Sequence, residues 1–217
     1  FMAAGKEKLK ILVTSSISGE GKTFTSINLS IIYAFSGKRT VLLGADMRKP
    51  KIFQDFGLNN DLGLSSILIG KANLQDSTQN THVENLDLIS SGPIPPNPAE
   101  LIESDRMDNL FKELEGKYDV IIIDSPPLGL VTDALLLKKY SDANLYIVRH
   151  NFTKINYLEN INKLHKDQVV SNVGIIVNAV STNSLTGGYG YGYGYGYGYG
   201  YGGYGYGYYS EDVDKRK

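Results

Sequence analysis

Short runs of aliphatic residues recur between Lys8 and Asn183 and alternate with segments whose apolar residues follow a helical period. The runs are rich in β-branched residues and nearly continuous in hydrophobicity, which favours strands buried on both faces. Strands that alternate with helices in this way are typical of an α/β fold with a parallel sheet. The sequence predicts six strands, at Leu9–Thr14, Thr40–Leu43, Leu86–Ile89, Val120–Ile123, Asn144–Val148 and Val173–Val177.

Helices are predicted between these strands. The first helix carries apolar residues on one face, as expected of a helix that packs on a core: Phe24, Ile27, Ile31, Ile32 and Phe35. Gly37 then stands where a helix C-cap is expected. Further helices are predicted at Ala99–Glu115, Thr132–Tyr140 and Ile155–Lys166. The segment Ser90–Pro98 contains four of the seven prolines and is predicted to be a loop.

The turn between the first strand and the first helix reads SISGEGKT, from Ser16 to Thr23. It matches the phosphate-loop pattern G-x-x-x-x-G-K-[ST], with Ser16 in place of the first glycine. Its glycines let backbone N–H groups turn toward phosphate oxygens at a helix N-terminus, while the lysine reaches the β and γ phosphates and the threonine hydroxyl binds Mg²⁺. We therefore predict an ATP and Mg²⁺ site with the nucleotide contacts Ser18, Gly19, Glu20, Gly21, Lys22, Thr23 and Phe24.

Two carboxylates follow buried strands and are expected at the same sheet edge as the phosphate loop. Asp46 lies in RTVLLGADMRKP, and Asp124 ends the apolar run of YDVIIIDSPP. Ligands bind at the carboxyl ends of the strands in open α/β sheets, and a carboxylate after such a strand holds Mg²⁺ through water. We predict Thr23, Asp46 and Asp124 as the metal site, and Lys22, Asp46, Asp124 and Arg48 as the catalytic residues. Each Asp alone is equally compatible with capping a turn.

Composition and charge exclude several classes of function. Lys plus Arg (22) against Asp plus Glu (23) gives a net charge of −1, so the chain has no overall positive field for nucleic acid. The chain has no Cys, which removes disulfides and thiolate chemistry. No apolar run approaches the roughly 18 residues of a membrane span. The start at Phe1, before Met2, indicates a fragment of a longer protein.

The stretch Gly187–Tyr209 contains only glycine and tyrosine. It holds 11 of the 16 tyrosines and 12 of the 24 glycines of the chain and has no aliphatic residue with which to build a core. We predict a disordered tail over residues 187–217, in which the 23 Gly/Tyr residues have a root-mean-square span of roughly 26 Å. Its candidate phosphoacceptors are Tyr189, Tyr191, Tyr193, Tyr195, Tyr197, Tyr199, Tyr201, Tyr204, Tyr206, Tyr208 and Tyr209.

Taken together, SSISGEGKTF, GADMRKP, PPNPAELIESDRM, YDVIIIDSPP and the tyrosine cluster resemble the catalytic domain of the bacterial tyrosine kinases of capsule and exopolysaccharide synthesis. The resemblance implies a P-loop NTPase three-layer sandwich with a mainly parallel sheet over residues 1–186. It implies ATP- and Mg²⁺-dependent autophosphorylation of the tail in trans. The family's second motif usually reads Asp-x-Asp-x-Arg, and Gly44 stands at its first Asp, which leaves Asp46 either as the general base or only as a metal contact.

The resemblance also implies partners and a location. These are a ring-like homo-oligomer, a transmembrane polysaccharide co-polymerase region or activator, and a tyrosine phosphatase, with this chain as the cytoplasmic domain of an inner-membrane protein or complex. Asn178 resembles the adenine-contacting Asn of related ATPases or caps its strand. Arg48 and Lys49 either orient phosphate or lie in a solvated loop, and Arg106 either meets a neighbouring subunit or lies on a helix surface.

The alternative function is that of a partition or cell-division ATPase of the same superfamily. Those proteins carry a signature lysine at the position of Ile17, and they lack a tyrosine tail. Under that interpretation the chain is a nucleotide-dependent assembly switch, and its Tyr/Gly tail is a self-associating segment.

Overall fold

The structure is a computed structural model of the chain and describes residues 7–128 and 133–180. The chain divides into two units, Phe1–Val180 and Ser181–Lys217, and the described residues belong to the first. The predicted boundary between residues 186 and 187, the predicted disorder of the tail and the predicted acceptors Tyr189 to Tyr209 lie outside the described residues.

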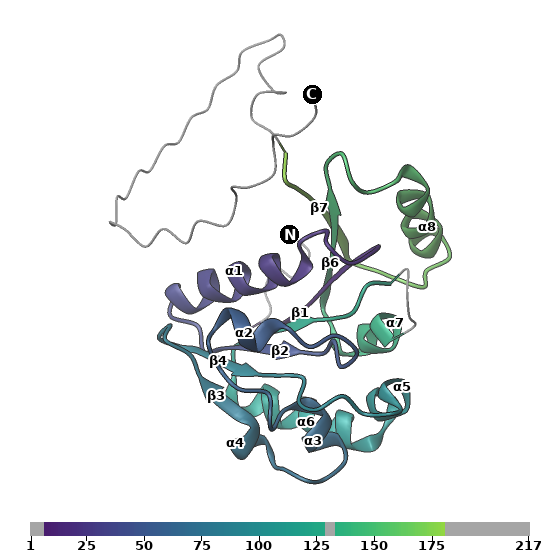
Figure 1. The fold of residues 1–217 in the computed structure, drawn as a ribbon. Coiled ribbons are helices and arrows are strands. Elements are labelled where there is room, and N and C mark those ends of the chain that lie inside the picture. The colour runs from purple at the N-terminus through teal and green to yellow at the C-terminus, as the bar shows by residue number, and fades with distance from the viewer. Residues whose placement is uncertain (1–6, 129–132, 181–217) are drawn as a thin grey trace, which may run out of the picture. The chain divides into compact units, whose positions relative to one another are not determined.

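A seven-stranded sheet forms the centre of the first unit, with the strand order β3–β4–β2–β5–β1–β6–β7 (Figure 1). Neighbouring strands are parallel except β3 and β4, which are antiparallel. The polar β3 (Thr78–Asn80) is not predicted, because it lacks an alternation of apolar residues. The six predicted strands are confirmed as β1 (Leu9–Ser15), β2 (Thr40–Gly44), β4 (Leu86–Ile89), β5 (Val120–Asp124), β6 (Ala143–Arg149) and β7 (Val173–Asn178).

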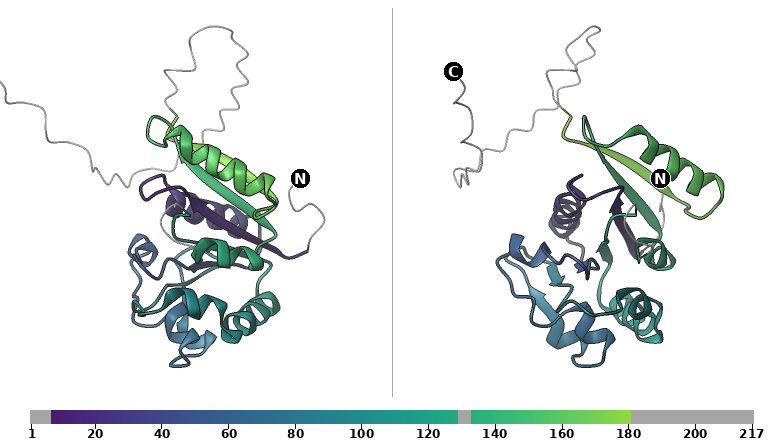
Figure 2. Two further views of the ribbon diagram at one scale, coloured as in Figure 1. Left: turned by 90° about the vertical axis from the view of Figure 1, so that its right-hand side faces the viewer. Right: turned by 45° about the vertical axis from the view of Figure 1, so that its right-hand side comes forward.

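Helices cover both faces of the sheet, which confirms the three-layer sandwich (Figure 2). On one face, α1 (Lys22–Phe35) and α2 (Ile52–Asp55) pack on the central strands. The other face is covered by α3 (Leu64–Leu68), α4 (Leu74–Ser77), α5 (Pro98–Glu103), α6 (Asp105–Lys117), α7 (Asp133–Leu137), the 3₁₀ turn η1 (Lys138–Tyr140) and α8 (Ile155–Lys166). The very short α2, α3 and α4 are not predicted, since four or five residues show no helical period.

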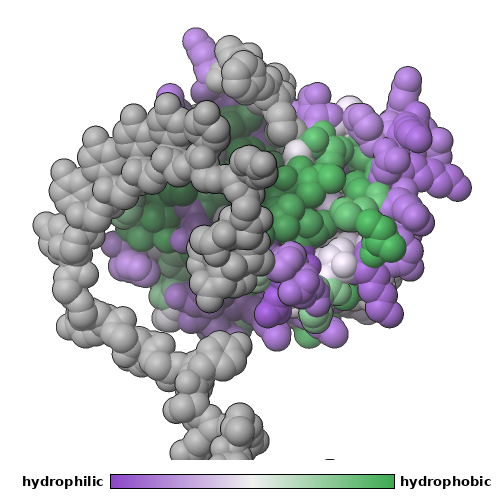
Figure 3. Space-filling model, turned by 90° about the horizontal axis from the view of Figure 1, so that it is seen from above, coloured by the Kyte–Doolittle hydropathy of each residue, from purple (hydrophilic) through white to green (hydrophobic). Residues whose placement is uncertain are grey.

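The central strands of the sheet are buried on both faces, as predicted, but the edge strand β7 is not. Every residue of β2 and β5 is buried, as the continuous hydrophobicity of these strands predicts. In the edge strand β7, Ile175 and Val177 are 53% and 55% exposed. Figure 3 shows the molecule from above, the side on which β7 and α8 lie in Figure 1. Apolar side chains are gathered on this side.

The prediction of which face of α1 is buried is wrong in part. Phe24, Ile32 and Phe35 are exposed, and the fully buried residues of the helix are small ones: Ser26, Ser30 and Ala34. Ile27 and Ile31 are half-buried against the core, as expected. Small residues let α1 lie close to the sheet, and this brings the Ser26 hydroxyl within reach of a strand-end carboxylate. Ser36 is the C-cap of α1, and Gly37, predicted at the C-cap, follows it with φ 79°.

The single helix predicted over Ala99–Glu115 is two helices. Ser104 between α5 and α6 is extended, with φ −73° and ψ 153°. The break lets each helix bury its own apolar residue against the core, Ile102 in α5 and Met107 in α6, both fully buried. The predicted loop over Ser90–Pro98 is confirmed up to Asn97, and Pro98 occupies the first turn of α5.

Candidate active site

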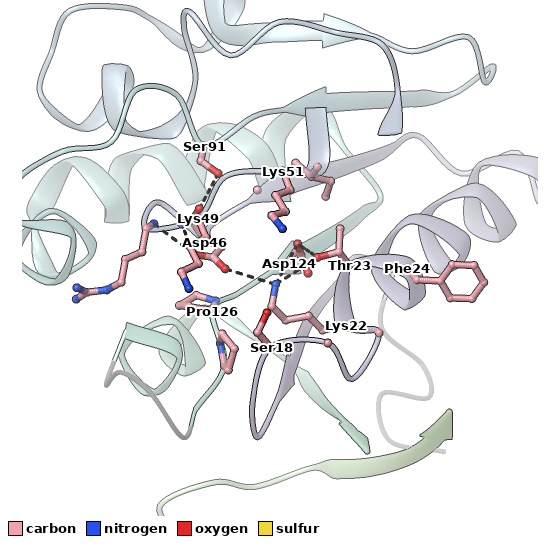
Figure 4. Close-up of a pocket in the computed structure, with 16 residues that line it drawn as sticks. Ser18, Lys22, Thr23, Phe24, Asp46, Lys49, Lys51, Ser91, Asp124 and Pro126 are labelled. Atoms are coloured by element: carbon pink, nitrogen blue, oxygen red, sulfur yellow. Dashed lines mark hydrogen bonds and ion pairs between the residues drawn. The ribbon is translucent and has the colours of Figure 1, made fainter. Parts of the chain in front are cut away.

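The candidate site lies where β1, β2 and β5 end at their carboxyl sides. Gly44 of β2 and Val13 of β1 are both in register with Asp124 of β5, so the turns after the three strands start side by side. These turns surround a cavity of about 310 Å³ (Figure 4). The topology therefore brings the three sequence motifs to one edge of the sheet, as predicted.

The phosphate loop is built around two left-handed glycines. Gly19 has φ 91°, and Gly21, the N-cap of α1, has φ 97°. A Cβ on Gly21 would lie 2.0 Å from the Asn178 side-chain nitrogen, so the Asn178 side chain would have to shift, and the left-handed conformation itself favours glycine. The loop ends at the N-terminus of α1, where free N–H groups and the helix dipole favour an anion.

Lys22 lies between the two carboxylates of the site. Its Nζ is 3.5 Å from Asp46 Oδ2 and 3.7 Å from Asp124 Oδ2. It also lies 3.2 Å from the hydroxyl of Thr23, which donates to Asp124 Oδ2 at 2.9 Å. The structure thus brings together the predicted phosphate lysine, the predicted magnesium hydroxyl and both predicted acids (Figure 4).

Asp124 is a buried carboxylate whose charge is compensated locally. Its two oxygens accept hydrogen bonds from Thr23 and, at 3.0 Å, from Ser26 of α1. Burial raises the pKa of the Asp124 carboxyl, while the positive charge of Lys22 and the two hydroxyl hydrogen bonds oppose this rise. A divalent cation would favour the ionised form in the same way, and the converging hydroxyl and carboxylate oxygens are donors that fit Mg²⁺.

Asp46 is held in one orientation by its own loop. Its Oδ1 accepts hydrogen bonds from the backbone N–H groups of Arg48 (3.3 Å) and Lys49 (3.0 Å), so Oδ2 is the oxygen that faces Lys22. Arg48, predicted to be catalytic, is among the residues that line the cavity, but its side chain donates two hydrogen bonds to Asp133, at 2.8 and 3.1 Å. Asp133 is not among the site residues predicted from the sequence. Its only sequence signal is an acidic residue near the start of a predicted helix.

Gly44 lines the cavity, and a Cβ at this position would be in tight contact with its neighbours. A Cβ at this position would lie 3.0 Å from Ile52 Cγ2 and 3.2 Å from both the N and Oγ of Ser91. Ser91 in turn donates a hydrogen bond to the Asp46 carbonyl oxygen at 3.1 Å. The space that the family's first Asp would enter is therefore bounded closely by Ile52 and Ser91 in this chain.

Glu20 and Asn178, two predicted nucleotide contacts, stabilise the phosphate loop from outside the cavity. The fully buried Glu20 carboxylate accepts hydrogen bonds from the Ile17 N–H at 2.8 Å and from the hydroxyl of Thr153. Asn178 donates to the Glu20 carbonyl oxygen at 3.0 Å, and its Oδ1 accepts from the N–H of Ala179 at the end of β7. Neither Glu20 nor Asn178 lines the cavity, so their side chains fix the loop in this structure.

The other predicted contacts lie around the opening. Ser18, Gly19, Gly21, Lys22, Thr23 and Phe24 all line the cavity. Phe24, in the first turn of α1, is 66% exposed and stands at the rim (Figure 4). Ser16, in the position of the first glycine, is buried and hydrogen-bonds to the Tyr146 hydroxyl at 2.7 Å. Over residues 7–128 and 133–180, no helix is long and apolar enough to cross a membrane.

The chain matches the family model described as an AAA domain over residues 9–177. It is 37% identical over 154 residues to tyrosine-protein kinase YwqD of Bacillus subtilis, covering 71% of this chain and 65% of that one. It is 44% identical over 134 residues to putative tyrosine-protein kinase CapB of Staphylococcus aureus, covering 62% and 59%. Tyrosine-protein kinase CpsD of Streptococcus agalactiae is 33% identical over 186 residues, covering 85% and 80%. The chain thus spans less than two thirds of the first two relatives.

Solved structures agree with these sequence matches. The chimerical protein CapA2B2 superposes with a TM-score of 0.76 and 36% identity, covering 81% of this chain and 77% of that one. The kinase domain of the Escherichia coli tyrosine kinase ETK has a TM-score of 0.76 and 30% identity, covering 87% and 74%. The septum site-determining protein MinD of Pyrococcus horikoshii, solved with Mg-ADP, is more distant, with a TM-score of 0.64 and 23% identity over 78% of this chain and 70% of that one. The likeness to MinD shows a shared fold alone.

Proposed function

This chain belongs to the family of bacterial tyrosine-protein kinases, and from that premise we propose that it is an ATP-dependent tyrosine autokinase. The observation that carries the proposal is the convergence of Lys22, Thr23, Asp46 and Asp124 at one sheet edge. A phosphate loop with two acids at this edge is what phosphoryl transfer from a magnesium nucleotide requires.

Each side chain of the site has a distinct task in the proposed reaction. Lys22 binds the β and γ phosphates and balances the charge that builds up as the phosphoryl group leaves. Thr23, Asp46 and Asp124 would hold Mg²⁺, which would supply positive charge to offset that of the phosphates. Asp46, whose Oδ2 faces Lys22, also accepts the proton of the incoming tyrosine hydroxyl, whose ordinary pKa is near 10.

We propose the tyrosines between Tyr189 and Tyr209 as the acceptors, used in trans between copies of the chain. The support is the sequence, in which a hydroxyl recurs at nearly every second residue among glycines. A flexible tether gives an effective concentration on the mM scale at any site within its reach, so weak recognition of the sequence suffices. Each added phosphate brings roughly −1.5 to −2 charges, and the repulsion between several of them would extend the tail and weaken assembly.

The partners that we propose follow from the family. They are further copies of the same chain in a ring, a transmembrane polysaccharide co-polymerase region that activates the kinase, and a tyrosine phosphatase that resets it. The proposed location is the cytoplasmic face of the membrane that carries the co-polymerase. The relative YwqD and the structure of the ETK kinase domain carry the word kinase in their names, which supports the activity and leaves the partners to experiment.

Intact mass after incubation with Mg-ATP tests the activity. Protein that has first been stripped of phosphate should gain several phosphates, and Lys22→Met should gain none, because it lacks the ammonium group that contacts both acids and the phosphates. Lys112→Met is the matched control, since Lys112 is an exposed residue of α6 outside the cavity, and it should behave as the unmodified chain. No added phosphate in the unmodified chain, or equal addition in Lys22→Met, would contradict the proposal.

The same incubation with Mg-ATP distinguishes the tyrosine autokinase from the alternative function, a partition or cell-division ATPase. A partition-type ATPase would release inorganic phosphate without adding phosphate to the protein. The observation against this alternative is Ile17, which stands where those ATPases carry their signature lysine.

A further inference from the structure

A charged pair beside the reacting groups joins Arg48 to Asp133. The two guanidinium nitrogens Nε and Nη2 lie 2.8 and 3.1 Å from the two carboxylate oxygens, which is a bidentate pair. The Asp133 side chain is 2% exposed, whereas that of Arg48 is 43% exposed. The carboxylate is therefore the fixed partner, held at the start of α7, and the loop after β2 is tied to it through Arg48.

This pair continues directly into the candidate site. The backbone N–H of Arg48 donates to Asp46 Oδ1 at 3.3 Å, beside the stronger bond from Lys49 at 3.0 Å. Because Oδ1 is held in this way, Oδ2 is left to face Lys22 at 3.5 Å. The carbonyl oxygen of Asp46 is also held, by the hydroxyl of Ser91. Ala45 and Met47, on either side of Asp46, are buried in the core on the face that α7 covers, and Arg48 adds a charged attachment to α7 itself.

We propose that Asp133 is a positioning residue for phosphoryl transfer, acting through Arg48 to fix the direction in which Asp46 presents its free carboxylate oxygen. This inference rests on the proposed function, since it assigns Asp46 to the reacting groups. Arg48 is then a positioning residue too, because its guanidinium is engaged by Asp133 and its backbone holds Asp46. A displacement of about 1 Å at a reacting group costs up to 100-fold in rate, so a fixed loop matters for catalysis.

A purely structural pair predicts a different behaviour. If the pair only fastened α7 to the loop, its loss would lower stability and leave turnover per folded molecule unchanged. If it positions Asp46, its loss lowers kcat while Lys22 and Thr23, which belong to the phosphate loop, still bind the nucleotide. The distinguishing readouts are kcat against KM, and the dependence of ADP affinity on Mg²⁺.

Asp133→Asn is the direct test, because it keeps the size of the side chain and removes its charge. We expect kcat for autophosphorylation to fall about 10- to 100-fold with the KM for Mg-ATP changed by no more than about 3-fold. ADP affinity without Mg²⁺ should stay the same, and the gain in ADP affinity on adding Mg²⁺ should shrink. Asp108→Asn is the matched control, since Asp108 is also an Asp in the first turn of a helix and pairs with Lys139 and Tyr140 outside the site.

Arg48→Lys is the second variant and serves if Asp133→Asn does not fold. It keeps the charge at a half-exposed position but loses the bidentate geometry, so an intermediate fall in kcat is expected. Unchanged kcat and unchanged Mg²⁺ dependence in these variants, at a temperature where they are as folded as Asp108→Asn, would overturn the proposal. If the unmodified chain adds no phosphate, the proposed function fails. The Mg²⁺ dependence of ADP binding, compared between the unmodified chain and Asp133→Asn, still decides whether Asp133 positions Asp46.

Discussion

At the scale of single residues, the site depends on a few side chains that each make two contacts. Thr23 joins Lys22 to Asp124, and Lys22 joins Asp124 to Asp46, so no member can move alone. Gly21 is fixed just as closely, because Asn178 occupies the space that any Cβ would need. The phosphate loop therefore tolerates little change even where the residue touches no ligand.

Gly21→Ala should abolish nucleotide binding while leaving most of the fold intact. The added Cβ collides with Asn178 and also requires a non-glycine residue at φ 97°, so the loop must shift away from its anion-binding shape. Titration with a fluorescent ADP analogue measures the loss. The control is Gly116→Ala in α6, where a Cβ meets nothing within 4 Å. It should bind normally and raise the free energy of unfolding by about 0.5–1 kcal/mol.

Asp124→Asn should remove the benefit of Mg²⁺ for nucleotide binding. The amide keeps the shape of the carboxylate, but its single oxygen can accept from only one of Thr23 and Ser26, and it carries no charge for a divalent cation. We expect ADP affinity measured with Mg²⁺ to fall to the value measured with EDTA. An undiminished response to Mg²⁺ in Asp124→Asn would remove Asp124 from the metal site.

At the scale of the elements, the strands are predicted well and the helix faces poorly. Strands such as β2 and β5 are buried on both sides, so continuous hydrophobicity identifies them without further information. The face of α1 is different, because Phe24, Ile32 and Phe35 are exposed and the contact with the sheet is made by small residues. A helical pattern of apolar residues cannot show that close approach to a sheet selects serine and alanine.

Sequence patterns also do not predict the side-chain contacts between distant residues that complete the site. The three motifs are each local, so the sequence predicts Lys22, Thr23, Asp46 and Asp124 at one sheet edge, and the structure brings them together. The pair of Arg48 with Asp133 joins residues 85 positions apart. Nothing in the spacing of either residue identifies the other, because only the packing of α7 places Asp133 beside the loop.

Substitutions on α1 test which face is buried. Ala34→Leu enlarges a residue that is 2% exposed, so overpacking against the sheet should lower the free energy of unfolding by about 1–3 kcal/mol. Ile32→Ala removes a larger side chain that is 63% exposed and should change it by no more than about 0.5 kcal/mol. Urea unfolding followed by circular dichroism measures both. If Ile32→Ala lowered the free energy of unfolding more than Ala34→Leu does, the buried face of α1 would be the one expected from the sequence.

The contact of α6 with η1 gives a dependence on alkaline pH. Phe111 of α6 stacks on Tyr140 at 4.2 Å between ring centroids. Burial and the hydrogen bond to Asp108 raise the pKa of Tyr140 to about 12. Since the unfolded tyrosine ionises near pH 10, the folded state keeps its proton longer, and stability falls as the pH rises from about 10 to 12.

Tyr140→Phe should flatten this part of the pH profile. The variant loses the hydrogen bond to Asp108 and is less stable than the unmodified chain at pH 8, but it has no proton to lose at this position above pH 10. Urea unfolding at several pH values compares the two slopes. Equal slopes would show that Tyr140 does not contribute to alkaline unfolding.

At the scale of the whole molecule, the chain combines a kinase-family domain with a segment of a very different composition. The sandwich over residues 7–128 and 133–180 carries the candidate phosphoryl donor site, and the stretch Gly187–Tyr209 carries 11 tyrosines. The central claim is that the first part phosphorylates the second. It requires both the site chemistry and the choice of acceptor to be as proposed.

Mapping of phosphotyrosines by tandem mass spectrometry after incubation with Mg-ATP tests this claim most directly. A Lys22→Met chain, which is inactive by itself, is mixed with an active chain whose 11 tail tyrosines are replaced by phenylalanine. We predict phosphate on tyrosines 189–209 of the Lys22→Met chain, delivered by its active neighbour. No phosphate on these tyrosines, in this mixture and in the unmodified chain alone, would contradict the account.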